Sequence, residues 1–396
     1  MAKDESVSRP PVMTETELAM LRASLARFVA GEMPRERARR WDREDHFPRD
    51  VFAKLTALGV TGLTVPVAYG GSGPDITATM AVIEELSKRS LAVAVPYIMC
   101  ACYAGMNIAE SGSPEQKAHY LPRIAAGEVL FSYGLTEAEA GADLASVRTQ
   151  ARRDGDKIIV RGSKRFCTGA NIADTIYCLV SSDAGAPRHQ NLSILLIPTD
   201  APGVGITVTD AIGMKGAPTT DVVLDDVVLP LAAIVGGAAG WNKGWPMLVG
   251  PVLNVERLEV AAMALGIAEA AFADAWDYAQ QRVQFGKPVS SYQAIRHKLA
   301  DMKTDLLACR LMLYHAAGLA DRGEPFGAES AMVKLFVTER GKAIVLDCQS
   351  IIGAYGLTPD FDIERHVRDM LILPIVGGSS NIQRNNIANM LGLAKA

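Results

Sequence analysis

A glutamate on an otherwise apolar helical stripe is the first candidate for chemistry in this sequence. Residues 254–266 are rich in alanine, leucine, methionine and glutamate, so they predict a helix. Apart from Glu259, helical spacing from Glu256 reaches only apolar residues, namely Val260, Met263 and Ile267. Desolvation on a buried stripe would raise the pKa of this carboxyl, as a proton-abstracting base near neutral pH requires. The alternative is a glutamate at a helix start that is solvated or paired with Arg257.

The composition is that of a well-packed globular protein. Of the 396 residues, 49% are hydrophobic and 21% are charged, and the chain is long enough for two or three subdomains. The net charge of −4 gives no overall attraction to nucleic acid or to an anionic membrane surface. We therefore expect neither as a partner.

Cysteine usage and apolar runs bear on the compartment. The six cysteines lack metal-ligand spacing and a Cys-x-x-Cys pair, so we expect buried free thiols in a reducing cytosol and no metal site. The first twenty residues have no continuous apolar core, so no signal peptide is predicted. Residues 91–104 are apolar but too short to span a membrane, and predict a buried segment broken at Pro96. The expectation is a soluble, cytoplasmic protein without membrane insertion.

The hydrophobic period divides the chain into three parts. We predict an α-helical domain over 1–128, a β domain over 129–240 and an α-helical bundle over 241–396, an α+β protein. A capping box beginning at Ser113 marks one helix start. The glycine-rich residues 236–240 predict a flexible connection. Strands rich in Val, Ile and Thr are predicted at 129–135, 157–160, 175–181, 192–197, 206–210 and 221–229.

Several motifs carry a resemblance to a known family. They are residues 63–73 and 113–128, YGLTEAEAGAD at 133–143, GSKRFCT at 162–168, RVQFGKP at 282–288, and GAYG at 353–356 followed by 364–365 and 368–369. Together they resemble the acyl-CoA dehydrogenase family from about residue 15 to the end. The family fold consists of a helical N-terminal domain, a middle β-barrel or sandwich domain and a C-terminal helical bundle. Members bind FAD non-covalently and form dimers or tetramers.

The resemblance implies a set of cofactor contacts within one chain. Thr168 would reach the flavin N5 region, and Phe166 would pack on the isoalloxazine; the alternative for Phe166 is an ordinary strand-core aromatic. Backbone and hydroxyl groups of 133–136 would bind the flavin edge, with glycine allowing close approach. The implied contacts are Tyr133, Leu135, Thr136, Gly141, Ala142 (where serine is common), Phe166, Thr168, Ser379 and Asn381.

A second set of contacts would come from the neighbouring subunit. The planar fork of Arg282 suits a pyrophosphate, with Phe285 stacking nearby, although an isolated arginine is more often a surface residue. The resemblance assigns to this set Arg282, Phe285, Gln293, Ser350 and Gly353. A monomer would therefore lack half of its cofactor site.

The resemblance also concerns the catalytic base. Most members carry a glutamate near the C-terminus that removes the α-proton, and here that position is Gly377. A minority, including isovaleryl-CoA and long-chain acyl-CoA dehydrogenases, place the glutamate on a helix directly before an arginine, as in Glu256-Arg257. Glu259 is the rival base one turn away, and two close carboxylates would raise one pKa. We prefer Glu256 because its position matches the minority pattern.

Substrate contacts follow from the same resemblance. The backbone N–H of Gly377, with a flavin ribityl hydroxyl, would bind the thioester oxygen as charge develops. Asn254 and Arg257 are candidate substrate contacts. The placement of the base occurs in enzymes for branched and for long chains, so the sequence does not choose the acyl group.

Three functions fit these observations. The first is an FAD-dependent acyl-CoA dehydrogenase of fatty-acid or branched-chain acyl metabolism, forming a 2,3-enoyl thioester and passing electrons to an electron-transfer flavoprotein. The second is a dehydrogenase or oxidase acting on an acyl-carrier-protein thioester in a biosynthetic pathway. The third is a non-catalytic flavoprotein that binds nucleic acid, which predicts a basic C-terminal face. The last thirty residues hold only Arg368, Arg384 and Lys395 as basic residues, which argues against the third.

Overall fold

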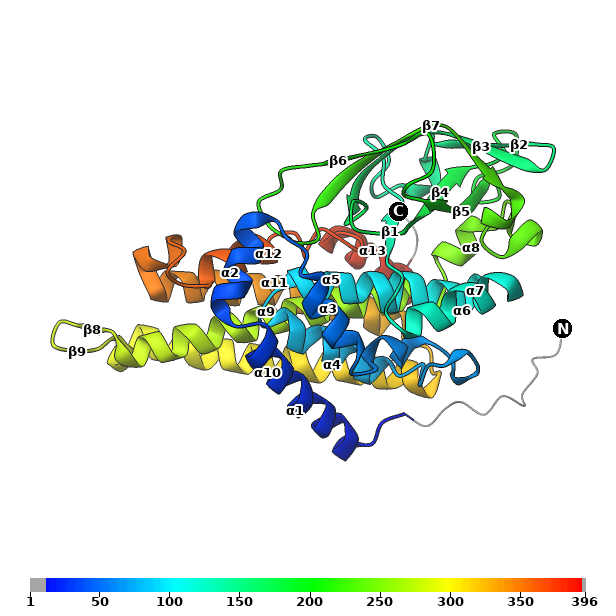
Figure 1. Cartoon of the computed structure of the whole chain (residues 1–396). Coiled ribbons are helices and arrows are strands. Elements are labelled where there is room, and N and C mark those ends of the chain that lie inside the picture. The colour runs from blue at the N-terminus through cyan, green and yellow to red at the C-terminus, as the bar shows by residue number, and fades with distance from the viewer. Residues whose placement is uncertain (1–11, 394–396) are drawn as a thin grey trace.

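The computed structural model describes residues 12–393, in which a curled sheet separates two helical regions along the chain (Figure 1). This arrangement confirms the predicted fold class. Residues 1–11 and 394–396 lie outside the described residues. They include part of the segment from which no signal peptide is predicted, and Lys395 of the C-terminal end.

The first region packs seven α-helices around a buried segment. Both Ser113 and Thr14 form capping boxes with the third residue of the helix that follows, which confirms the start predicted at Ser113. Short 3₁₀ turns, Val60–Thr64 and Val67–Tyr69, connect α3 to α4. The helices are α1 (Glu15–Glu32), α2 (Arg35–Glu44), α3 (Arg49–Thr56), α4 (Ile76–Ser87), α5 (Leu91–Ile98), α6 (Asn107–Ser111) and α7 (Pro114–Ala125).

The predicted break at Pro96 is wrong. The helix continues from α5 through the π-helical turns η3 (Met99–Met106) into α6. All eight residues of α5 are buried, and this packing outweighs the hydrogen bond that Pro96 cannot donate. Among residues 12–393, Leu91–Ser111 is the one helix long and apolar enough to cross a membrane, and 89% of its apolar window is buried inside the protein, as in a core helix.

The middle region is a seven-stranded curled sheet. Its order is β1-β4-β2-β3-β7-β6, with β5 paired to β4; β4 runs parallel to β1 and β2, and the remaining pairs are antiparallel. All six predicted strands are present, but β2 was missed because its sequence, QARRD, is mostly charged. The strands are β1 (Phe131–Gly134), β2 (Gln150–Asp154), β3 (Lys157–Thr168), β4 (Thr175–Ser181), β5 (Leu192–Pro198), β6 (Val204–Val208) and β7 (Thr219–Pro230).

The glycine-rich connection, predicted to be flexible, adopts a defined turn with hydrogen bonds to the first helical region. Gly237–Gly240 form a 3₁₀ turn, and the Gly236 N–H donates to Gln116 Oε1 at 3.0 Å. Gln116 Nε2 donates in turn to the carbonyl oxygens of Ala232 and Ile234. The sheet is thereby fixed to the start of α7 where the chain enters the second helical region.

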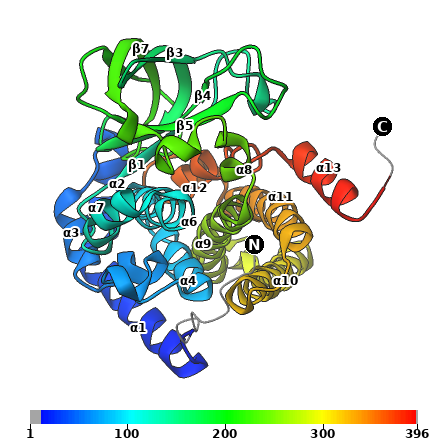
Figure 2. The same cartoon turned by 90° about the vertical axis from the view of Figure 1, so that its right-hand side faces the viewer.

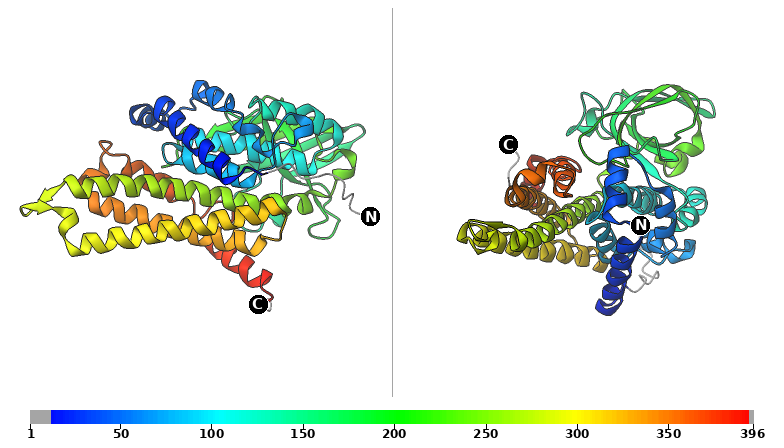
Figure 3. Two further views of the ribbon diagram at one scale, coloured as in Figure 1. Left: turned by 90° about the horizontal axis from the view of Figure 1, so that it is seen from below. Right: turned by 60° about the vertical axis from the view of Figure 1, so that its left-hand side comes forward.

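The second helical region is built on three long helices that lie side by side (Figures 2 and 3). The central one, α9, packs against α11, α10 and α4. A short hairpin of β8 and β9 projects from the bundle where α9 leads into α10 (Figure 3). The elements are α8 (Gly244–Leu248), α9 (Pro251–Gln281), β8 (Val283–Gln284), β9 (Lys287–Pro288), α10 (Gln293–Arg322), α11 (Gly327–Ile352), α12 (Ile363–Met370) and α13 (Ser380–Met390).

Contacts around Glu84 hold α9 close to the first region. A Cβ added at Gly266 of α9 would lie 2.3 Å from the Glu84 carbonyl oxygen, so only glycine permits this approach of the two helices. The buried Glu84 carboxylate accepts from Arg22 of α1 at 3.0 Å and from Arg310 of α10 at 2.5 Å. These cations outweigh the burial that would raise the pKa of Glu84 and hold it at about 2.

Candidate active site

Glu256 lies in the second turn of α9 at the junction of the three regions. Its side chain is half-buried, whereas Val260, Met263 and Ile267 of the predicted stripe are buried, as expected. Burial raises the pKa of Glu256 to about 7, against the opposing charges of Arg257 and Lys334. A carboxyl with this pKa is partly ionised at neutral pH. Its ionised form is basic enough to accept a proton from a substrate carbon whose acidity is increased on binding.

Gly377 faces Glu256 from the turn between α12 and α13. A Cβ added at Gly377 would lie 3.9 Å from Glu256 Oε1 and 3.2 Å from Val260 Cγ2. A side chain on residue 377 would therefore point into the space that the Glu256 carboxylate occupies. The structure brings the two predicted catalytic positions together, although they lie far apart in the sequence.

Glu259, the rival base, has a different environment. It is 1% exposed, and one of its carboxyl oxygens has no hydrogen-bond partner within residues 12–393. Burial, together with the charge of Glu256, raises the pKa of Glu259 to about 8, opposed by a hydrogen bond from Cys102 of η3. No cation is among the groups that shift this pKa, so Glu259 is mainly protonated at neutral pH. This geometry favours Glu256 as the base.

The two predicted substrate contacts bind each other. Arg257 Nη1 donates to Asn254 Oδ1 at 2.8 Å and to Ser330 Oγ of α11 at 3.2 Å. Arg257 is 4% exposed, and burial lowers the pKa of its guanidinium. The direct contact with substrate that the sequence predicts for Arg257 remains a prediction, and the structure shows it joining α9 to α11 behind the base.

Two stacked tyrosines border the site on the side of the sheet. The rings of Tyr103 from η3 and Tyr133 from β1 lie 3.8 Å apart at 11°. Asn107 Nδ2 donates to the Tyr133 hydroxyl at 2.6 Å. Burial and the charge of Glu256 raise the pKa of both phenols, so both remain neutral donors beside the base. Tyr103 could not be identified from the sequence because it lies in a continuous apolar run.

The loop predicted to bind the flavin edge is fixed by a buried ion pair. Lys164 of β3 donates to Glu137 Oε1 at 2.8 Å and to the Leu135 carbonyl oxygen at 3.2 Å, and both charged side chains are buried. The pKa of Glu137 is lowered because Lys164 outweighs the effect of burial. The Arg165 N–H donates to the Thr136 carbonyl oxygen at 2.8 Å. These contacts set Leu135 and Thr136 against β3, whereas Gly141 and Ala142 lie on the exposed side of the loop.

Phe166 and Thr168 at the end of β3 fit a planar aromatic cofactor. Phe166 is 57% exposed with φ of +58°, a conformation that is rare for an aromatic residue and turns its ring out of the strand core. The Thr168 hydroxyl has no hydrogen-bond partner within the described part of the chain. An exposed ring beside an unpaired hydroxyl and a fixed polar loop suits the isoalloxazine of FAD, rather than the strand-core alternative for Phe166.

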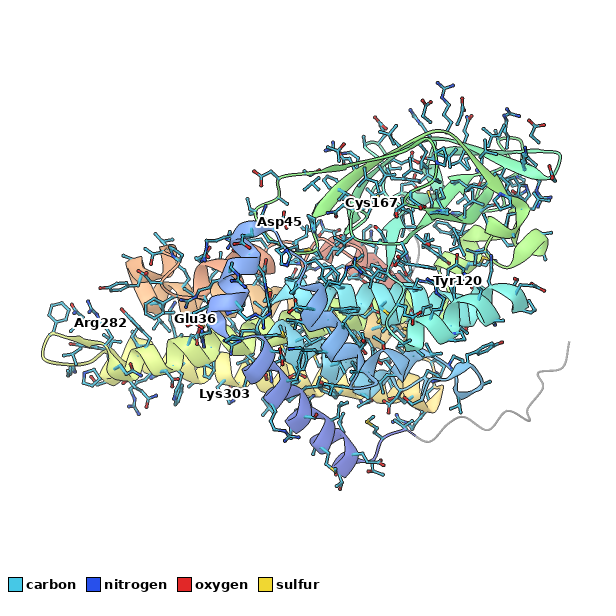
Figure 4. The ribbon with its side chains drawn as sticks, in the orientation of Figure 1. Glu36, Asp45, Tyr120, Cys167, Arg282 and Lys303 are labelled. Atoms are coloured by element: carbon cyan, nitrogen blue, oxygen red, sulfur yellow. The ribbon has the colours of Figure 1, made fainter. Side chains whose placement is uncertain are left out.

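The remaining predicted cofactor contacts fall into two places. Ser379 caps α13 by accepting from the Ile382 N–H, and Asn381 is exposed on the same helix, next to the Gly377 turn. In contrast, the hairpin side chains lie at the far end of the bundle: Figure 4 shows Arg282 there and Cys167, the neighbour of Thr168, in the sheet. Arg282 and Cys167 therefore lie far apart within one chain (Figure 4), and the contacts predicted for Phe285, Gln293, Ser350 and Gly353 remain predictions.

Comparisons with known proteins agree with this architecture. Family models described as the N-terminal, middle and C-terminal domains of acyl-CoA dehydrogenase match residues 15–128, 132–227 and 242–392. An acyl-CoA dehydrogenase of Bacillus subtilis is 36% identical over 376 residues, covering 95% of this chain and 98% of the relative. A 3-(aryl)acrylate reductase of Clostridium sporogenes is 36% identical over 377 residues, covering 95% and 99%. The structure of butyryl-CoA dehydrogenase from Megasphaera elsdenii superposes with a TM-score of 0.90 at 29% identity, covering 96% and 98%.

The chain belongs to the acyl-CoA dehydrogenase family. Members of this family depend on FAD, and the chain is accordingly an FAD-dependent oxidoreductase acting on acyl-CoA. The structure places Glu256 beside Gly377, the position at which the resemblance predicts the catalytic glutamate of most members.

Proposed function

We propose that this protein dehydrogenates an acyl-CoA thioester between its α and β carbons, giving the 2,3-enoyl-CoA, with electrons passing to an electron-transfer flavoprotein. One observation carries the proposal: the Glu256 carboxylate lies 3.9 Å from the point where a Cβ on residue 377 would stand. The chain therefore keeps a carboxylate at the family's catalytic position, supplied from α9.

The residues present support a simple division of roles. Glu256 accepts the α-proton, and its raised pKa makes the ionised form a sufficiently strong base near neutral pH. Bound FAD supplies the acceptor for the β-hydrogen, which leaves with its electron pair. The Gly377 N–H, which has no partner within residues 12–393, is placed to donate to the thioester oxygen as negative charge develops there. The substrate thus loses one proton and one hydride, and a carbon–carbon double bond forms.

We further propose that the active form is a dimer or a tetramer. Phe285 is 94% exposed, and Arg282, at the start of the same hairpin, lies at the far end of the bundle from Cys167, the neighbour of Thr168 (Figure 4). A neighbouring copy would supply these side chains to the FAD site. The six buried, unpaired cysteines support a reducing cytosol as the compartment.

Anaerobic reduction of the FAD-loaded protein tests the proposal. Loss of the flavin absorbance is measured after mixing with saturated acyl-CoAs of straight, branched and aromatic character. Bleaching by at least one of them, with formation of the enoyl product, is expected. A protein that is bleached by none of them, but whose chemically reduced flavin is reoxidised by enoyl-CoAs, would instead be a reductase. Bleaching only by acyl-carrier-protein thioesters would support the second function considered above.

A further inference from the structure

The turn that contains Gly377 is held by two buried side chains from other elements. Lys334 Nζ of α11 donates to the Gly378 carbonyl oxygen at 2.8 Å. Gln383 Nε2 of α13 donates to the carbonyl oxygens of Gly377 and Gly378, at 2.9 Å each. Lys334 and Gln383 both have 0% exposure, which is unusual for these residue types. The two glycines have φ of +64° and +84°, and their conformational freedom means that outside contacts must fix the turn.

Within residues 12–393 these contacts leave the backbone N–H of Gly377 unpaired, together with those of Gly378 and Ser379; of the three, Gly377 is the residue that faces Glu256. On its N-terminal side the Val376 N–H donates to the Ile372 carbonyl oxygen at 3.0 Å, and on its C-terminal side Gln383 holds the Gly377 carbonyl. The Gly377 N–H therefore lies between fixed groups, beside Glu256. A donor held in advance where charge develops is what stabilises an oxyanion in a transition state.

Lys334 also faces the base. Its charge opposes the increase in the pKa of Glu256 that burial causes. Burial lowers the pKa of Lys334 itself to about 8, against the charges of Glu256 and Glu339, so the amine remains mainly protonated at neutral pH. Arg384 of α13 pairs with Glu339 at 2.9 Å. The other titratable or charged groups around this pair are Arg257 and Glu259 of α9, Cys102 and Tyr103 of η3, and Tyr133 of β1.

We propose that Lys334 and Gln383 are positioning residues that orient the Gly377 N–H toward the thioester oxygen, and that Lys334 in addition favours the ionised form of Glu256. This inference rests on the proposed function. It assigns two distinct effects, because only one of the two side chains carries a charge. Removal of either one disturbs the turn, and removal of Lys334 alone changes the titration of the base.

Four variants of the FAD-loaded protein separate these effects. Gln383→Met and Lys334→Met each remove the donor at similar volume, Lys334→Gln keeps a donor without charge, and Lys342→Met changes an exposed lysine of the same helix as a control. Each is assayed for FAD content, thermal midpoint and the rate of anaerobic flavin reduction between pH 5 and 9, with saturating and subsaturating acyl-CoA.

The expected results differ among the variants. Gln383→Met lowers the saturated reduction rate by about 10- to 100-fold, since misplacement on the order of 1 Å has this effect, and leaves the acid limb of the pH profile in place. Lys334→Met lowers the rate similarly and moves the acid limb to higher pH. Lys334→Gln recovers part of the rate but keeps the shifted limb. The substrate concentration for half-maximal rate changes little, and Lys342→Met matches the wild type.

A binding measurement adds a readout that does not depend on turnover. A 3-oxoacyl-CoA forms an enolate whose ultraviolet absorbance reports its ionisation, and a fixed N–H donor stabilises that enolate. We expect the wild type to lower the pH at which the bound ligand ionises and Gln383→Met to lose at least half of that shift. Wild-type rates, an unmoved acid limb and unchanged enolate formation in folded Gln383→Met and Lys334→Gln would overturn the inference while leaving the proposed function intact. Failure of every thioester to reduce the wild type would overturn both.

Discussion

The surroundings of Glu256 and the β8–β9 hairpin represent opposite ways of building a functional site. Around Glu256, α9, α11 and the turn before α13 meet within one chain, and the polar groups are held by buried partners. On the hairpin, Phe285 is 94% exposed and Arg282 lies over the Tyr355 ring at 6.0 Å. We therefore infer that the groups proposed for proton transfer come from a single chain, whereas retention of the cofactor requires two.

Removal of the base gives the largest effect. Glu256→Gln keeps the shape of the side chain but cannot accept the α-proton, so the rate of anaerobic flavin bleaching should fall by about 10³- to 10⁴-fold, the upper range for a general base. FAD content and oligomeric state, measured by absorbance and light scattering, should not change. Bleaching of Glu256→Gln at the wild-type rate would mean that the base lies elsewhere.

Removal of the hairpin arginine should affect the cofactor instead. Arg282→Ala would lose the charge-assisted contact to the pyrophosphate that the resemblance predicts, so FAD should dissociate about 10- to 100-fold more readily, corresponding to roughly 1.5–3 kcal/mol. The measurement is the dissociation constant of FAD by flavin fluorescence, with Arg161→Ala, an exposed arginine of β3, as the control.

Mixed oligomers sharpen this second test. When Glu256→Gln and Arg282→Ala subunits are mixed and reassembled, one site of each hybrid dimer carries both defects and the other carries neither. Activity at limiting FAD should then exceed that of either parent. Absence of any recovery in confirmed hybrids would indicate that each chain completes its own site.

The pH dependence concerns the base alone. Because the pKa of Glu256 is raised to about 7 and the ionised form is active, the rate at subsaturating substrate should fall about tenfold per pH unit below that value. The raised pKa also means that the folded protein binds a proton more tightly than the unfolded chain. This carboxyl therefore contributes stability below pH 4.5 that is lost as the pH rises through 7. Rate profiles and denaturant unfolding across pH 5–9 measure both; a flat rate profile would contradict the assignment.

Substitution of the second carboxyl should have the smallest effect. Burial and Glu256 raise the pKa of Glu259 to about 8, so it is mainly protonated at neutral pH, and Glu259→Gln replaces one neutral group with another. We expect a change of at most about threefold in bleaching rate at pH 7, because the two carboxyls titrate as a coupled pair but only one is charged. A loss comparable to that of Glu256→Gln would make Glu259 the base.

The order of helical and strand regions could be predicted from the sequence more fully than the structure of the connections between them. The change of hydrophobic period at residue 129 located the sheet, because a half-buried strand and a helix require different spacing of apolar residues. The spacing of apolar residues did not predict β2, because most of its residues are exposed. The helix also continues through Pro96, because tertiary packing outweighs the local preference of proline. The turn at residues 236–240 could not be predicted because it depends on hydrogen bonds with Gln116, which lies in a different region of the chain.

The site could be predicted only where a single segment carried the signal. Glu256 stands out on an apolar stripe, whereas Lys334 lies on the buried face of α11 between Ser330 and Thr338, whose polar side chains obscure the same signal. The functions inferred for Lys334 and Gln383 depend on carbonyl groups of a turn that they reach only in the folded protein. The sequence cannot show which backbone donors of this turn remain unpaired, nor that Gly377 is the one of them that faces Glu256.

The glycine at residue 377 has a consequence for how such enzymes diverge. Its left-handed backbone and the 3.2 Å contact that a Cβ would make with Val260 disfavour any side chain there, and the nearest carboxylate already fills the space. Moving the base between the two segments takes two substitutions. The intermediate sequence therefore has either two crowded carboxylates or none. If Glu256 is the base, each arrangement is therefore expected to persist within its branch of the family.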